Sequence, residues 1–333
     1  MIVSRFKMKD LTPCSQGDIR RLAVHLSTGL AVLLSITGSL FAQSPPNVEL
    51  VFEGAFGIEG SQPGQFFNPR GITVGERGQI IVADSGNDRI QICDDQGRCT
   101  AFGRRGERLG EFTNPHGVVV DSRGRIITLE TYTARVQIFD SEGEFLGSFG
   151  GYGSGLAQFR VPGGLTVDSQ DRIIIADELN NRIQICDDQG NCTAFGSEGT
   201  EPGQFRIPRG VAVDSQDRII VADRDNHRIQ ICDDHGNCTT FGSYGTAVGQ
   251  FAAPSEVAVD SRDRIIVADR DNHRIQVCNQ QGNCKAFGRF GTAPGEFSSP
   301  PAVAVGKQDR VVVADRGNNR IQIFQLISGV ERK

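Results

Sequence analysis

Residues 210–241 read GVAVDSQDRIIVADRDNHRIQICDDHGNCTTF, and most of the chain is built from copies of this segment. β-Branched residues gather in short runs separated by Asp, Asn, Gln and Gly, which is typical of antiparallel strands joined by tight turns. Four runs are visible, and we call them strands a to d: 210–214, 218–223, 228–232 and 238–241. The segment therefore predicts a four-stranded antiparallel sheet.

The segment recurs six times at a spacing of about 46 residues. A proline opens each copy, at Pro69, Pro115, Pro162, Pro208, Pro254 and Pro300. An arginine recurs with the same spacing, at Arg89, Arg135, Arg182, Arg228, Arg274 and Arg320. Four short strands repeated at this period are typical of a propeller blade. We therefore predict an all-β, six-bladed β-propeller.

The two ends of the repeat array are predicted to close the ring. The sixth copy ends in strand c, at 322–327, and has no strand d of its own. Residues 50–57 precede the first copy and match strand d of the second copy, 145–150. Because closure removes the open strand edges of the array, we expect the N-terminal strand to complete the last blade. The propeller then spans 48–328, followed by a short tail, 329–333.

Two motifs identify a family resemblance. The sequence Ala-Asp-x-x-Asn-His-Arg-Ile-Gln occurs at 222–230 and 268–276, and Gly-Gln-Phe-x-x-Pro-x-Gly occurs at 203–210. These motifs resemble the NHL repeat, and the resemblance covers about residues 48–328. It implies a six-bladed β-propeller of the kind often used for protein or ligand binding.

Eight cysteines form four pairs with the spacing Cys-x5-Cys: Cys93 and Cys99, Cys186 and Cys192, Cys232 and Cys238, Cys278 and Cys284. Each pair flanks the turn between strands c and d, where facing residues are close enough for a disulfide. Repeat two has Phe139 and Phe145 instead, so both cysteines are replaced together. We predict four disulfides; buried free thiols are the alternative. A four-thiolate metal site is disfavoured because each pair lies on its own blade.

The composition excludes several classes of protein. The chain has 333 residues, 41 of them glycine, no tryptophan, and a net charge of −5. Propellers of the WD type carry a tryptophan in each repeat, so that family is excluded. The negative net charge argues against a nucleic-acid partner, which would require a basic surface.

The N-terminal residues 1–42 predict export. A basic leader precedes a short apolar core at 30–36, and Ala42 ends an acceptable cleavage site, the pattern of a signal peptide. An uncleaved membrane anchor is the alternative, since 22–42 could just span a bilayer. The ninth cysteine, Cys14, lies in this segment. We expect a periplasmic, secreted or membrane-anchored protein.

The candidate ligand site lies on the face formed by the d–a loops and b–c turns (the d–a/b–c face). Positions where a repeat breaks its own pattern are candidates, because something other than the fold selects their residues. The residue after the opening proline varies, and repeat two replaces the Ala-Asp motif with LETYTAR at 129–135. We predict a ligand or peptide pocket near the channel mouth; drift in a tolerant repeat is the alternative. The candidates are Arg70, His116, Glu130, Tyr132, Arg209 and Glu256.

Two recurring charged sets are not assigned to the ligand site. The Asp that ends strand b, as at Asp223, recurs in five copies and is predicted to pair with the recurring arginine, since a group present in nearly every blade holds the blade. The c–d turns on the opposite face (the a–b/c–d face) are mostly acidic, as at 233–234. We expect a solvated surface there; calcium binding is the alternative.

The sequence favours a binding protein over an enzyme. Related propeller lyases hold zinc with several histidines at the channel, and here only His116 is expected there, while His227, His273 and His235 lie elsewhere. No catalytic residues or cofactors are predicted, although zinc or calcium stays open. We expect a monomer that binds a protein, peptide or glycan; a lyase- or lactonase-type enzyme with a metal at the channel is the alternative.

Overall fold

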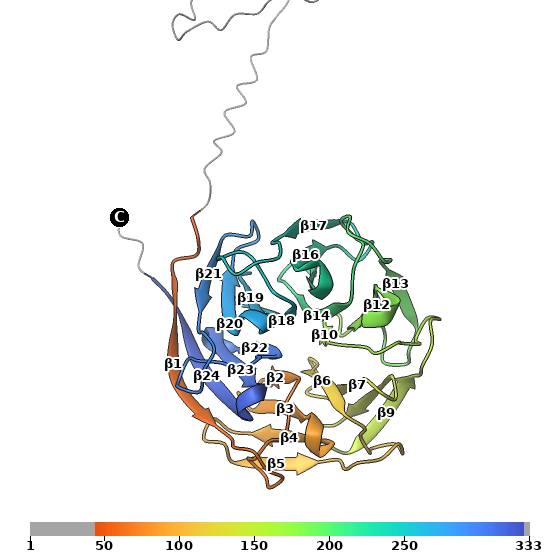
Figure 1. Cartoon of the computed structure of the whole chain (residues 1–333). Helices are drawn as coiled ribbons and strands as arrows, with labels where there is room; N and C mark the ends of the chain where they lie inside the picture. The colour runs from red at the N-terminus through yellow and green to blue at the C-terminus, as the bar shows by residue number, and fades with distance from the viewer. Residues whose placement is uncertain (1–43, 330–333) are drawn as a thin grey trace, which may run out of the picture. The chain divides into compact units, whose positions relative to one another are not determined.

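The computed structural model of the chain describes residues 44–329, and these form a six-bladed propeller with four strands in each blade (Figure 1). Blade 1 contains β2 (Ile72–Val74), β3 (Ile80–Asp84), β4 (Arg89–Cys93) and β5 (Cys99–Phe102). Blade 2 contains β6 (Pro115–Val120), β7 (Ile126–Glu130), β8 (Arg135–Phe139) and β9 (Phe145–Gly150). Blade 3 contains β10 (Leu165–Val167), β11 (Ile173–Asp177), β12 (Arg182–Cys186) and β13 (Cys192–Phe195).

Blade 4 contains β14 (Pro208–Val213), β15 (Ile219–Asp223), β16 (Arg228–Cys232) and β17 (Cys238–Phe241). Blade 5 contains β18 (Pro254–Val259), β19 (Ile265–Asp269), β20 (Arg274–Cys278) and β21 (Cys284–Phe287). Blade 6 contains β22 (Ala302–Gly306), β23 (Arg310–Asp315), β24 (Arg320–Ser328) and β1 (Val48–Phe56). Short 3-10 turns are η1 (Ser85–Asn87), η2 (Glu178–Asn180), η3 (Arg224–Asn226), η4 (Arg270–Asn272), η5 (Lys307–Asp309) and η6 (Arg316–Asn318). The all-β prediction is confirmed.

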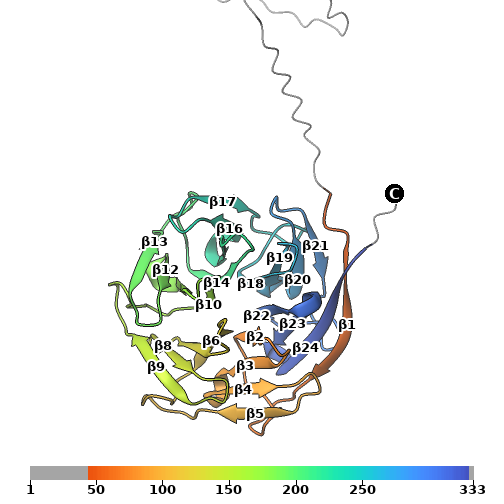
Figure 2. The same cartoon turned by 180° about the vertical axis from the view of Figure 1, so that it is seen from behind.

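The ring closes between the N-terminal and C-terminal strands, as predicted. β1 pairs antiparallel with β24 along its whole length, from Val48 opposite Ser328 to Phe56 opposite Ile321. Figures 1 and 2 show these two strands side by side at the outer edge of the last blade. The rings of Phe52 and Phe324 pack edge to face with centroids 5.7 Å apart. The last blade therefore takes its outer strand from the start of the propeller.

The hydrophobic core is divided between neighbouring blades. Between blades 3 and 4, Ile174 packs in one cluster with Val211, and Phe205 from the connecting d–a loop lies fully buried in it. Gly196 has a φ of +101°, and a Cβ there would lie 2.6 Å from the Phe205 ring, so only glycine fits. Fully buried phenylalanines recur at each junction: Phe66, Phe112, Phe159, Phe205, Phe251 and Phe297.

A buried carboxylate connects the strands of each blade to the preceding d–a loop. In blade 4, Oδ1 of Asp223 accepts the backbone N–H of Arg206 at 2.8 Å. Its Oδ2 accepts hydrogen bonds from Asn226 Nδ2 at 2.9 Å, Arg228 Nε at 2.8 Å and Gln230 Nε2 at 3.0 Å. Arg228 also donates to d–a loop carbonyls. The predicted structural role of the Asp–Arg pair is confirmed.

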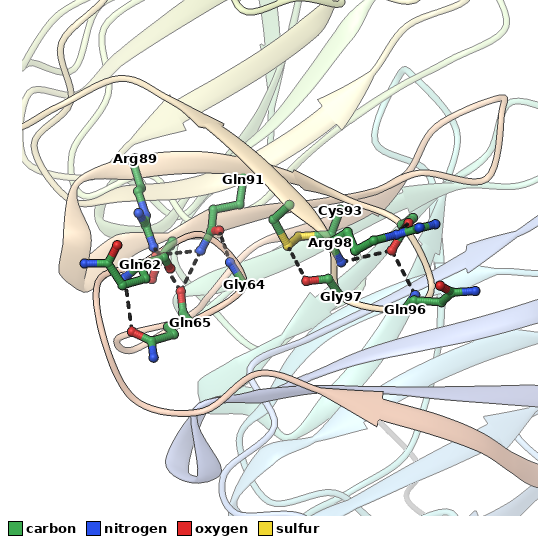
Figure 3. The surroundings of a disulfide bond; sticks show 12 residues. Gln62, Gly64, Gln65, Arg89, Gln91, Cys93, Gln96, Gly97 and Arg98 are labelled. Atoms are coloured by element: carbon green, nitrogen blue, oxygen red, sulfur yellow. Dashed lines mark hydrogen bonds and ion pairs between the residues drawn. A yellow bond between two sulfur atoms is a disulfide. The ribbon is translucent and has the colours of Figure 1, made fainter.

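All four predicted disulfides are present. They join Cys93 to Cys99, Cys186 to Cys192, Cys232 to Cys238, and Cys278 to Cys284. Figure 3 shows the first of them beside the c–d turn, with Gln91 and Arg89 on the same strand bonded toward the d–a loop. The paired cysteines face each other across the hairpin, with Cα atoms 4.0 Å apart in the first pair. In blade 2, the rings of Phe139 and Phe145 occupy the corresponding places, 5.9 Å apart.

The predicted leader, residues 1–42, lies outside the described residues. Within residues 44–329, no helix is long and apolar enough to cross a membrane.

Candidate functional site

The innermost strands of the six blades, β2, β6, β10, β14, β18 and β22, surround the centre of the ring (Figure 1), and residues of these strands line a central channel. The channel contains a cavity of about 180 Å³, lined mainly by Val, Ala, Gly and Thr residues such as Val118, Ala212 and Thr166. Among the described residues that line this cavity, Glu256 is the one with an ionisable side chain. The ionisable chemistry of the described cavity lining is therefore that of Glu256.

His116 and Arg209 meet beside the channel although 93 residues separate them in the chain. Nη2 of Arg209 lies 3.1 Å from Nε2 of His116, and Nδ1 of His116 lies 3.0 Å from the carbonyl oxygen of Gly163. Because a guanidinium only donates, Nε2 accepts this hydrogen bond and Nδ1 carries the proton that it donates to Gly163. Burial, reinforced by Arg209 and Arg70, lowers the pKa of His116 well below its usual value. His116 is therefore neutral, and both of its ring nitrogens are engaged.

Glu256 is a protonated acid at neutral pH. Burial raises the pKa of its carboxyl to about 8, and a backbone hydrogen bond and Arg209 offset only part of that effect. Oε1 of Glu256 accepts the backbone N–H of Val257 at 3.2 Å. A Cβ on Gly210 would lie 2.4 Å from that oxygen, so the glycine in the preceding blade permits its approach. Glu256 can thus donate a hydrogen bond into the channel mouth.

Arg209 and Arg70 are cations with incomplete pairing. The side chain of Arg209 is only 8% exposed, and its Nε lies 3.9 Å from Oε1 of Glu178. Burial lowers the pKa of Arg209 to about 10, so it keeps its charge at neutral pH. Burial, followed by repulsion from Arg316, lowers the pKa of Arg70. The Nε atoms of Arg70 and Arg209 are buried and have no hydrogen-bond partner among the described residues.

The structure gives Glu130 a role in the blade framework, whereas the sequence predicted it in the ligand site. Its side chain is fully buried and takes the place of the framework aspartate in blade 2. Its carboxylate accepts hydrogen bonds from the backbone N–H of Thr113, from Arg135 Nε and from Gln137 Nε2. A carboxylate that is one methylene longer reaches the same donors, so the break in the repeat is structural drift at this position. Tyr132, two residues further, is 70% exposed and stays on the surface of this face.

Four charged residues at the mouth are not among the residues predicted from the sequence. They occupy one repeat position, the first residue of the b–c turn: Glu178, Arg224, Arg270 and Arg316. Glu178 is buried, and burial raises its pKa, while Arg209 and Arg224 act in the opposite direction. Blades 1 and 2 have Ser85 and Thr131 at this position. This variation along an otherwise regular repeat was the signal that could have identified them.

The other three histidines of residues 44–329 lie away from the channel. Nδ1 of His227 accepts the backbone N–H of Ala253 at 3.1 Å, and its ring packs on Tyr244 with centroids 4.8 Å apart. His273 makes the equivalent contacts in the next blade. His235 lies on a c–d turn beside Asp234. Among residues 44–329, no group of three or more His, Cys, Asp or Glu side chains is arranged to hold a metal ion.

On the a–b/c–d face, arginines of the a–b turns pair with acidic residues of the c–d turns. Arg125 lies 2.9 Å from Asp188 of the next blade, and Arg310 lies 3.5 Å from Asp95. The c–d aspartates also bond within their own turns, as where Oδ1 of Asp187 accepts the N–H groups of Gln189 and Asn191. These contacts assign the acidic residues to turn formation and blade-to-blade pairing.

The fold and the charged channel mouth define a closed six-bladed β-propeller with a polar site on its d–a/b–c face. A family model described as the NHL repeat matches residues 66–93, 112–139, 159–186, 205–232, 251–278 and 297–324. The chain belongs to the NHL-repeat family.

Two curated relatives match short parts of the chain. The chain is 38% identical over 73 residues to the protein brain tumor of Drosophila melanogaster, which is 20% of this chain and 7% of that protein. It is 52% identical over 42 residues to the protein lin-41 of Caenorhabditis elegans, which is 13% of this chain and 4% of that protein. The match therefore spans only a small fraction of these relatives.

Solved propellers share the fold at low identity. A streptogramin B lyase structure aligns with a TM-score of 0.58 at 15% identity, covering 84% of this chain and 97% of that one. This likeness is a likeness of fold.

Proposed function

We propose that this propeller is a non-catalytic binding module that captures a protein, peptide or glycan through its d–a/b–c face. The observation that carries the proposal is the incompletely paired charge at the channel mouth, centred on Arg209 and Arg70. Each framework arginine, such as Arg228, has its donors met by a carboxylate and by loop carbonyls. Charges that are buried without such compensation reduce stability, so their presence at one place supports a role in recognition.

The electrostatics of the mouth suit binding. His116 is neutral with both ring nitrogens bonded, and Glu256 holds a proton at neutral pH. Neither group is free to act as a base at neutral pH. Their neighbours Arg209 and Arg70 donate hydrogen bonds and accept none, so a ligand at this site has to supply the acceptors. This arrangement supports a non-catalytic site that presents hydrogen-bond donors to a ligand.

We further propose that the protein acts outside the cytoplasm as a monomer, with residues 1–42 serving as a signal peptide or anchor. The four disulfides support this proposal, because disulfides persist in oxidising compartments. The apolar core at 30–36 and the small-residue cleavage site ending at Ala42 also support export of the protein.

The test is capture of partners from the envelope fraction of the host. The wild-type propeller is compared with an Arg70→Gln, Arg209→Gln double variant and with Arg98→Gln. Arg98 is an exposed arginine of a c–d turn, so its variant makes the same kind of change on the opposite face. The double variant should lose the captured partner while its melting temperature stays close to that of the control. Unchanged capture by a folded double variant would refute the assignment of the site.

A further inference from the structure

Arginines from four blades converge on the channel mouth: Arg70, Arg209, Arg224, Arg270 and Arg316. They lie near enough to act on one another: burial and then Arg270 lower the pKa of Arg316. Burial also lowers the pKa of Arg209, where Glu178 acts in the opposite direction and Arg270 and Arg70 lower it further. This is a concentration of positive charge that the six-fold repeat does not require, since blades 2 and 3 contribute no arginine to it.

The carboxylates near these arginines do not balance them. Oε1 of Glu178 lies 3.9 Å from Arg209 Nε, Asp225 lies 3.4 Å from Arg224 Nε, and Asp271 lies 2.8 Å from Arg270 Nε. Glu256 adds no negative charge at neutral pH because it is protonated. Five guanidinium groups thus face three carboxylates, and two positive charges stay in excess.

The arginines also present hydrogen-bond donors without acceptors. The Nε atoms of Arg70, Arg209 and Arg224 are buried and make no hydrogen bond to the described residues, the 3.4 Å ion pair of Arg224 with Asp225 included. The side chain of Arg209 is more than nine-tenths buried, so its unmet donor is costly. Nε of Arg316 bonds the side-chain oxygen of Asn68, which holds this guanidinium in place at the junction of blades 6 and 1.

We propose that the channel mouth binds its ligand through a doubly charged oxyanion group, a phosphate monoester or a pair of carboxylates, held by Arg70 and Arg209 with Arg224, Arg270 and Arg316 around it. A guanidinium presents parallel N–H donors that match the spacing of two oxygens on one such group. The oxyanion neutralises the two excess positive charges and accepts hydrogen bonds from the buried Nε atoms. The apolar channel beneath, with Glu256 at its entrance, leaves room for little more than a small substituent.

This inference rests on the proposed function, because it names the chemistry that the same face recognises. The test is calorimetric titration of the purified full chain at pH 7 with inorganic phosphate, succinate and acetate at constant ionic strength. We expect saturable one-to-one binding of phosphate or succinate and no comparable binding of acetate. Tighter binding of phosphate assigns a phosphate monoester, and tighter binding of succinate assigns a dicarboxylate.

Two variants separate the site from general charge effects. Arg209→Gln should weaken the binding of whichever dianion binds more tightly about ten-fold. If Arg209→Gln does not fold, Arg270→Gln replaces it in the same measurement. Arg105→Gln is the matched control, because Arg105 lies on a d–a loop, with its side chain 87% exposed, and should leave the affinity within two-fold of wild type. Absence of dianion binding, or equal losses in the Arg209 and Arg105 variants, overturns the inference.

The outcomes also distinguish this inference from the proposed function. If Arg70→Gln, Arg209→Gln abolishes partner capture while the wild type binds neither phosphate nor succinate, the face binds its partner and the oxyanion chemistry is wrong. If a dianion binds at Arg209 while partner capture is unaffected, the anion site stands and the partner-binding surface lies elsewhere.

Discussion

Replacement of Glu256 by glutamine should stabilise the propeller at neutral and alkaline pH and leave its stability unchanged in acid. Burial at the channel raises the pKa of Glu256 to about 8 from an ordinary value of 4.5. Between these values the folded protein keeps a proton that the unfolded chain has released, so the free energy of unfolding falls as pH rises through this window. Glutamine has no proton to release, and its Oε1 can still accept the N–H of Val257.

The magnitude follows from the displacement of the pKa. One pKa unit corresponds to about 1.4 kcal/mol, so wild type loses about 3 kcal/mol of stability between pH 4.5 and pH 7 and about 5 kcal/mol by pH 8. The advantage of Glu256→Gln should therefore be close to zero at pH 4, about 3 kcal/mol at pH 7 and about 5 kcal/mol at pH 9. These are upper values, because the Glu256 side chain is partly exposed to the channel.

The assay is urea unfolding at pH 4, 7 and 9 with the disulfides intact, comparing wild type, Glu256→Gln and Glu142→Gln. Glu142 is an exposed acid on a c–d turn, so its variant should follow wild type at every pH. A Glu256→Gln variant whose unfolding free energy equals that of wild type at pH 9, or exceeds it equally at pH 4 and pH 9, would refute the reasoning.

Four further outcomes are expected. Reduction of the protein purified from its host should add eight hydrogens to its intact mass, one pair for each disulfide, and an unchanged mass would contradict this. If residues 1–42 are a cleaved signal peptide, the first residue should be Gln43, and an intact N-terminus would contradict cleavage. Cys232→Ala, Cys238→Ala should cost about 2 kcal/mol in urea unfolding, and a phenylalanine pair at the same positions, as in blade 2, should recover part of this loss. Asp223→Asn should cost roughly 3 kcal/mol, because it removes the charge that Arg228 pairs with in a buried network; a loss below 1 kcal/mol would show that the network is dispensable. Sulfate, whose charge is constant over the range, should bind wild type more weakly as pH rises past 8 and Glu256 ionises, and Glu256→Gln should lose this dependence in calorimetry.

The repeat made most of the fold predictable. Hydrophobic runs that recur six times specify each blade independently, so an error in one copy does not change the architecture. Closure was predictable because the sixth copy lacks a strand d and residues 50–57 match that strand in the second copy. The structure pairs β1 with β24, and Phe52 packs against Phe324 in the last blade. The disulfides followed from the same comparison between repeats.

The site was only partly predictable. Arg70, His116, Arg209 and Glu256 were predicted because each lies where the repeats differ from one another. The structure joins His116 to Arg209 by a hydrogen bond and places Glu256 in the cavity lining, and the role of all four in ligand binding stays a prediction. Glu130 was assigned there wrongly, because a carboxylate one methylene longer does the work of the framework aspartate. The turn arginines were missed because a turn residue's direction depends on its place within the turn. The first residue, as at Arg224, lies beside the mouth, whereas the fourth, as at His227, contacts the next loop.

The most direct test of the binding face is photo-crosslinking in the host. A photoreactive p-benzoyl-phenylalanine is placed at position 132, where the tyrosine is 70% exposed on the d–a/b–c face, or at position 235, where the exposed histidine lies on a c–d turn of the opposite face. We predict that illumination joins a partner to the protein labelled at 132 and that Arg209→Gln removes this adduct, while the protein labelled at 235 forms none. An adduct from position 235 alone, or equal adducts from both positions, would contradict the account.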